Sequence, residues 1–135
     1  MMNRLDAYLA TGNEAIDNQH SELIDKIYKL LNCCQEGGGK VETVKMLDYL
    51  SDYTEIHFAD EEKLQEVMAY PGLEEHKKAH NEFRQAVAEL HEMLVEEEGP
   101  TDAFVNAVQK NVKEWMFTHI QKVDQAMAEY VRLSA

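Results

Sequence analysis

Two short stretches of the chain pair metal-binding side chains at a spacing of four residues. They are His57 with Glu61 and His76 with His80. Residues four apart are neighbours on one face of a helix, so both members of a pair can reach the same ion. Imidazole and carboxylate ligands without a thiolate suit a first-row transition metal such as iron, manganese or zinc, and do not suit calcium. One such pair is weak evidence of a metal site, whereas two pairs at matching heights are much stronger.

Two further histidines, His20 and His119, share a property with both pairs. All six residues fall on the apolar stripe of their segment, where a side chain faces the core. Burying an unpaired imidazole or carboxylate is costly unless it is hydrogen-bonded, neutralised or bound to a metal. A lone core histidine such as His20 is more often a hydrogen-bonded structural residue than a ligand. Six such groups together predict a shared partner.

Two other residues with metal-binding side chains receive no role. His91 lies 11 residues after His80, which is roughly 16 Å along a helix and beyond reach of the same ions. Glu62 lies five residues after His57 and is expected to point away from the pair that contains this histidine.

Glycine and proline divide the chain into four segments with helical periodicity. The breakers are Gly37-Gly38-Gly39, Pro71-Gly72 and Gly99-Pro100. Between them apolar residues recur at spacings of three and four, and strand-like alternation never persists. Short connections between these segments imply that neighbouring helices run antiparallel. The sequence therefore predicts an all-α fold, an antiparallel up-down-up-down four-helix bundle with a short N-terminal arm before Asn13.

Counting residues from each connecting turn tests whether the candidate ligands can meet. His20 and His57 lie 18 and 19 residues from Gly38 in the turn between their segments. Glu61 and His80 lie 10 and 9 residues from the next turn, and His80 and His119 lie 19 and 20 residues from the last. Because antiparallel helices rise equally on both sides of a turn, these counts bring all four segments to one layer.

Composition narrows the classes of function. With 135 residues the chain is expected to form a single domain over residues 1–135. Its formal net charge of −13 disfavours nucleic acid and anionic membranes as partners. No apolar run is long enough for membrane insertion and the start lacks a signal peptide, so a cytoplasmic location is expected. The adjacent cysteines Cys33 and Cys34 indicate a reducing compartment and receive no metal role.

Four motifs together resemble the hemerythrins, and especially the bacterial members of that family. The resemblance covers nearly the whole chain. Its motifs are Ile16-Asp17-Asn18-Gln19-His20, His57 to Glu61, Tyr70-Pro71-Gly72 followed by His76, His80 and Phe83, and Trp115 to His119-Ile120 with Asp124.

The resemblance implies a non-haem, oxo- or hydroxo-bridged pair of iron ions held in a helical bundle. By this resemblance the seven ligands divide into three groups. His76, His80 and His119 ligate one iron, His20 and His57 ligate the other, and Glu61 and Asp124 bridge the two. With one bridging oxygen added, the first iron has six ligands and the second has five, so one position is open for dioxygen.

The turn before His119 is expected to shield this centre. Trp115 and Met116 should lie over the iron pair as the oxygen pocket, although hemerythrins often place leucine where Met116 stands. Asp124 follows His119 by five residues, a rotation of about 140° on an α-helix, so the helix must bend or break near Gln121 for both to reach iron.

The resemblance implies reversible dioxygen binding, as a carrier, store or supplier of oxygen, and no enzymatic activity. Two alternatives remain open. One is an oxygen or redox sensor domain of a larger signalling protein, and the other is a di-iron peroxidase or nitric oxide reductase. The resemblance implies dioxygen as a partner and leaves any protein partner unknown.

Overall fold

The structure is a computed structural model that describes residues 11–97 and 99–134. The described part of the chain forms three continuous helices and a fourth built from five consecutive pieces. The first three are α1 (Glu14–Gln35), α2 (Lys40–Val67) and α3 (Leu73–Glu96). The fourth consists of α4 (Asp102–Ala107), the π-helix η2 (Val108–Glu114), α5 (Trp115–His119), the π-helix η3 (Ile120–Asp124) and α6 (Gln125–Ser134).

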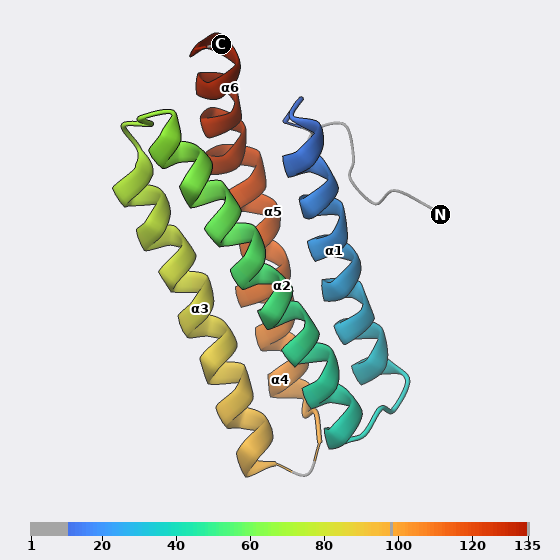
Figure 1. The fold of residues 1–135 in the computed structure, drawn as a ribbon. Coiled ribbons are helices and arrows are strands. Elements are labelled where there is room, and N and C mark those ends of the chain that lie inside the picture. Colours follow the sequence, from blue (N-terminus) through green and yellow to red (C-terminus); the bar gives the residue numbers. More distant parts are fainter. Residues whose placement is uncertain (1–10, 98, 135) are drawn as a thin grey trace.

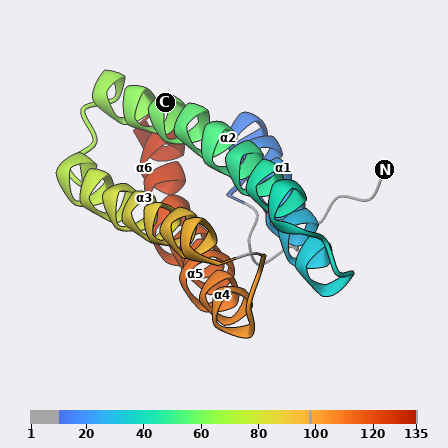
Figure 2. The ribbon, with the colours of Figure 1, turned by 90° about the horizontal axis from the view of Figure 1, so that it is seen from below.

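Successive helices run antiparallel and close into a bundle (Figure 1). Helix α1 packs on α2 and α2 on α3, and the fourth helix contacts both α3 and α1 through η2. Seen along the bundle, the four helices surround a common centre (Figure 2). The expected all-α, antiparallel four-helix bundle is therefore confirmed, while most of the expected N-terminal arm lies outside the described residues.

Local sequence signals set the helix boundaries. Asn13 caps α1, with its Oδ1 atom accepting a hydrogen bond from the Ile16 amide at 3.1 Å. Thr101 caps α4 in the same way through its hydroxyl oxygen. Such caps satisfy amide groups that have no partner inside the helix. Helices α2 and α3 begin directly after Gly39 and Gly72, at the breakers predicted from sequence.

The apolar core fills the end of the bundle that holds the α1–α2 and α3–α4 connections. Leucine, isoleucine, valine and phenylalanine side chains from all four helices are fully buried there, among them Leu30, Leu50, Leu90 and Val108. Dense packing at this end holds the helices in fixed register for the polar layer above it. No helix among residues 11–97 and 99–134 is long and apolar enough to cross a membrane.

Candidate metal centre

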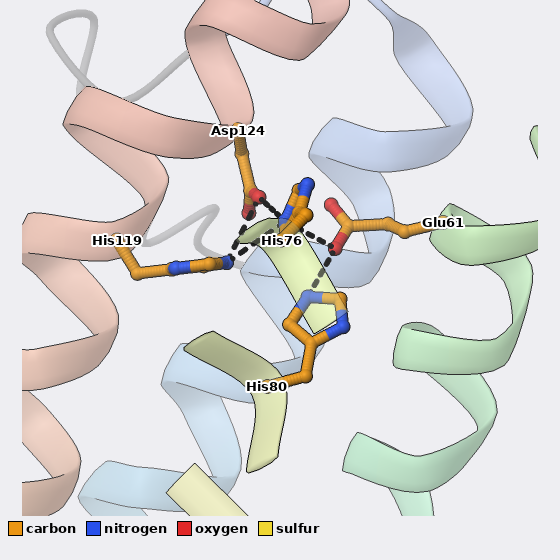
Figure 3. Close-up of side chains that lie close together, drawn as sticks. All are labelled: Glu61, His76, His80, His119 and Asp124. Atoms are coloured by element: carbon orange, nitrogen blue, oxygen red, sulfur yellow. Dashed lines mark hydrogen bonds and ion pairs between the residues drawn. The ribbon is translucent and has the colours of Figure 1, made fainter. Parts of the chain in front are cut away.

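All seven candidate ligands meet in one layer of the bundle interior. None is more than 4% exposed, and every helix contributes at least one. Figure 3 shows how Glu61, His76, His80, His119 and Asp124 point toward one another. The set comprises His20 from α1, His57 and Glu61 from α2, His76 and His80 from α3, His119 from α5 and Asp124 from η3.

Glu61 directs its two carboxylate oxygens at different histidines. Its Oε1 atom lies 3.2 Å from Nε2 of His80 and 3.7 Å from Nε2 of His76. Its Oε2 atom lies 3.3 Å from Nε2 of His57 and 3.5 Å from Nε2 of His20. One carboxylate therefore faces two histidine groups at once.

Asp124 divides its oxygens in the same manner. Its Oδ1 atom lies 2.9 Å from Nε2 of His76 and 3.1 Å from Nε2 of His119. Its Oδ2 atom lies 2.8 Å from Nε2 of His20. The ligand atoms consequently form two overlapping groups that share both carboxylates, each group lying within 4.8 Å.

Unpaired buried atoms test whether metal ions fit this cluster. Within the described part of the chain, Nε2 of His20, His57 and His80 and all four carboxylate oxygens of Glu61 and Asp124 are buried without a hydrogen-bond partner. Leaving so many buried polar atoms unsatisfied is very costly. Metal ions at the convergence of these lone pairs would remove that cost, so the residues present fit a metal centre.

Mutual contact shifts the pKa values of the carboxyl and imidazole groups in the cluster. Burial raises the pKa of Asp124, but the adjacent histidines, His119 foremost, hold it well below its usual range. The Glu61 pKa is likewise lowered by His57 and His20 against the opposing effect of burial. Burial lowers the pKa of His20, yet its two carboxylate neighbours raise that pKa to about 9. Protons on the histidines thus balance the negative charge of the carboxylates. Bound metal cations would take the place of those protons.

The π-helix η3 explains how Asp124 joins the cluster. Sequence analysis predicted a bend or break near Gln121, because five residues on an α-helix separate Asp124 from His119 by a wide angle. The helix instead continues through η3 (Ile120–Asp124) with a wider turn. Hydrogen bonds from residue i to i+5 bring residues five apart close to one face. The helix therefore does not break near Gln121 as expected from the sequence, but widens its turn there.

Hydrogen bonds to the outer nitrogens orient several histidines. The Nδ1 atom of His57 lies 2.6 Å from Oε1 of Gln19, which donates through Nε2 to Asp60. The Nδ1 atom of His76 lies 2.6 Å from the side-chain amide nitrogen of Gln65. With metal on Nε2 the His76 Nδ1–H must donate, so this amide must turn to offer its oxygen. The Oε1 atom of Gln65 is buried and has no hydrogen-bond partner among the described residues.

Three residues that contact the outer nitrogens of the histidines were not predicted from the sequence. Gln19 and Gln65 received no role, and Glu62, expected to point away from the site, lies 2.8 Å from Nδ1 of His80. A signal existed for Gln65, because it follows Glu61 by four residues and so continues the stripe that contains His57 and Glu61. Glu62 carries no such signal, since it lies off the buried stripe of α2 and its side chain is 21% exposed.

An aromatic layer covers the side of the cluster that faces the apolar core. The Phe58 ring stacks on His80 with ring centroids 3.7 Å apart, and Trp115 stacks on His119 at 4.5 Å. Phe83 contacts both Phe58 and Trp115. These rings separate the imidazoles from the leucine-rich core and restrict their rotation.

The residues expected to form the oxygen pocket occupy different environments. Trp115 lies directly against His119, and both line a groove of about 670 Å³ between α3 and the fourth helix. Met116 is fully buried in the apolar core. His119, at 4%, is the most exposed of the seven candidate ligands, so this groove marks where the cluster comes nearest the surface.

The fold and these contacts define a helical-bundle protein with a buried histidine–carboxylate cluster that is able to hold metal ions. The family model described as the hemerythrin HHE cation-binding domain matches residues 11–131. The chain belongs to the hemerythrin family.

Relatives and a solved structure agree with this membership. A bacteriohemerythrin of Pseudomonas paraeruginosa is 33% identical over 126 residues, covering 93% of this chain and 79% of the relative. A bacteriohemerythrin of Campylobacter jejuni is 26% identical over 122 residues, covering 90% of each. A crystal structure of wild-type hemerythrin matches with a TM-score of 0.84 and 28% identity, covering 100% of this chain and 99% of that one.

Proposed function

We propose that this protein binds dioxygen reversibly at a non-haem di-iron centre and serves as an oxygen carrier, store or supplier. His76, His80 and His119 bind one iron in this proposal, His20 and His57 bind the other, and Glu61 and Asp124 bridge the two. The observation that carries it is the division of both carboxylates, each with one oxygen toward each histidine group. Membership of the hemerythrin family supports iron as the metal.

The two ligand groups differ in number. The group around His76 contains five residues and the group around His20 contains four, with the carboxylates counted in both. The second group therefore offers one protein ligand fewer. We place the dioxygen position on the His20 and His57 side for this reason.

The ligand set and its burial suit reversible binding. When bound in the ferrous state, two irons would supply the two electrons that reversible dioxygen binding requires. Five neutral imidazoles against two carboxylates favour the ferrous state more than a carboxylate-rich set would. Burial of every candidate ligand limits the access of water and protons, and Trp115 stacks on His119 where the cluster comes nearest the surface.

A visible spectrum tests the proposal. The iron-loaded protein is reduced without air, exposed to air and then evacuated, with a spectrum recorded at each stage. An absorption band that forms in air and disappears under vacuum over repeated cycles is expected. Irreversible oxidation at the first exposure would contradict reversible binding and favour a di-iron peroxidase or reductase. The variant His57→Ala, which lacks a ligand, is the control that should show no band.

A second measurement separates the carrier from the sensor alternative. A sensor must change its structure on oxygenation so that a partner can detect the change. A carrier has no such requirement. Equal hydrogen exchange of α6 in the deoxygenated and oxygenated protein is expected, and a clear difference there would favour the sensor.

A further inference from the structure

Glu62 lies on the outer side of His80, opposite the ligand cluster. Its Oε2 atom is 2.8 Å from His80 Nδ1, and its side chain is 21% exposed. An ionised carboxylate can only accept, so Nδ1 carries the proton and donates. The lone pair of His80 is then on Nε2, 3.2 Å from Oε1 of Glu61. Glu62 thereby fixes both the tautomer and the orientation of this imidazole.

The contact on His80 differs in charge from its two counterparts. His57 and His76 meet the neutral carboxamides of Gln19 and Gln65 at their outer nitrogens. Among these three contacts within the described residues, only the one on His80 brings a full negative charge. A carboxylate that accepts from a metal-bound imidazole makes the imidazole a more basic ligand.

Arg84 places a positive charge beside Glu62. Its Nη2 atom lies 4.0 Å from Oε2 of Glu62, and its guanidinium stands 5.2 Å from the ring centroid of Phe58. Phe58 in turn stacks on His80. Two hydrogen bonds from Nε to the Glu55 carboxylate, at 2.8 and 3.0 Å, hold Arg84 in this place. The Arg84 side chain is 34% exposed, so the groups around His80 extend to the protein surface at this arginine.

We propose that Glu62 and Arg84 are positioning residues with opposed charges that set the reduction potential of the ion bound by His80. This inference rests on the proposed function, because it requires His80 to be a ligand. Glu62 favours the more positive, oxidised ion through the imidazole and so lowers the potential. Arg84 offsets part of the negative charge of Glu62 and so raises the reduction potential. Oxygen affinity changes with the reduction potential, because the binding of dioxygen oxidises the iron.

Three substitutions in the iron-loaded full chain separate charge from hydrogen bonding. Glu62→Gln keeps an acceptor for His80 but loses the charge, so iron content should stay unchanged while the potential rises. The expected rise corresponds to about tenfold in a one-electron equilibrium, or about 59 mV. Glu62→Ala loses the hydrogen bond as well and should bind iron at least about tenfold more weakly. Arg84→Gln should shift the potential in the opposite direction, and Glu62→Gln/Arg84→Gln should match Glu62→Gln alone.

Matched controls come from an exposed ion pair on the same helix as Glu62. Glu42 and Lys45 lie 3.8 Å apart near the start of α2, about 30 Å along the helix from Glu62. Glu42→Gln and Lys45→Gln change the net charge equally and should leave the potential in place. The measurement is a spectroelectrochemical titration of each variant, with iron content determined in parallel.

Distinct outcomes overturn the inference and the proposed function. If the Glu62→Gln potential equals that of wild type, or if Glu62→Gln and Arg84→Gln shift it in the same direction, the charge pair does not set the potential. An equal shift in the control variants would leave only an effect of net charge and overturn it too. A wild-type protein without iron or without a reversible couple would instead defeat the proposed function.

Discussion

Two carboxylates, those of Glu61 and Asp124, lie between the two histidine groups of the cluster. Glu61 and Asp124 each have both oxygens buried, and each oxygen faces a different set of imidazoles. A carboxylate that served only as a hydrogen-bond acceptor would need donors with suitable directions, which these atoms do not find among the described residues. This arrangement supports the proposed bridging role of both carboxylates.

Replacing Glu61 tests the bridging assignment. The variant Glu61→Ala removes a contact to both proposed ions, so its iron affinity should fall on the order of 100-fold or more. His57→Ala removes a contact to one ion and should retain more iron. Iron content after dialysis, measured by elemental analysis, gives the comparison. Equal occupancy in Glu61→Ala and wild type would rule out a bridge.

Histidine substitutions separate ligands from bystanders. His20→Ala and His119→Ala should abolish the oxygenated absorption band, because each removes an imidazole of the cluster. His91→Ala should leave the band intact, since His91 contacts Asp48 on the surface instead. The measurement is the visible spectrum in air at equal protein concentration. An unchanged band in either cluster variant would count against its ligand role.

The fourth helix is the element that completes the site. Helices α1, α2 and α3 present their ligands from regular α-helical turns. The fourth changes to π geometry twice, and η3 carries Asp124 onto the face of His119. Short π segments are uncommon and occur frequently at functional sites. Between the two lies α5, whose Trp115 packs flat on His119.

Shortening two side chains of α5 tests the expected role of this helix in retaining oxygen. Met116→Ala and Trp115→Ala should speed autoxidation severalfold, because each opens space through which water and protons reach the site. Iron content should stay near that of wild type, since neither side chain is a proposed ligand. The decay of the oxygenated band at fixed pH and temperature is the measurement. If both variants decay at the wild-type rate, the shielding pocket lies elsewhere.

The whole molecule consists of an apolar core at one end of the bundle and a polar layer beside it. The core supplies stability by burying side chains from all four helices. The polar layer subtracts from stability as long as its buried atoms stay unpaired. Fold and metal binding are therefore coupled, because bound ions favour the folded chain over the unfolded one.

The iron content of the purified protein tests the whole assignment. Two overlapping ligand groups predict about two irons per chain. Elemental analysis for iron, zinc and manganese is the measurement. One zinc per chain with no iron would contradict a di-iron centre.

Removing the metal should lower thermal stability without unfolding the bundle. An ion present at about 1,000 times its dissociation constant adds about 4 kcal/mol, which corresponds to a melting temperature roughly 10–20 °C higher. Thermal unfolding followed by circular dichroism, with and without a chelator, measures the difference. The variant His20→Ala should be less sensitive to the chelator. Identical melting curves for wild type in both conditions would show that no metal is bound.

The sequence by itself determined the bundle and most of the cluster. Breakers such as Pro71-Gly72 and the spacing of three and four along each stripe are local signals, so four helices followed directly from them. Equal rise along antiparallel helices then placed His20, Glu61 and His119 in one layer without coordinates. The assignment of Asp124 instead came from family resemblance, since α-helical geometry argued against it.

Only the tertiary structure decided the remaining features of the site. The wider turn of η3 was not visible because π geometry has no reliable local signal in a single sequence. The contact of Glu62 with His80, and the place of Arg84 beside it, depend on the rotation of α2 against α3. Stripe periodicity fixes which face of a helix is buried, whereas pairing across helices is fixed by side-chain packing at their boundary. For that reason the candidate ligands could be predicted before the structure, whereas the residues that contact their outer nitrogens could not.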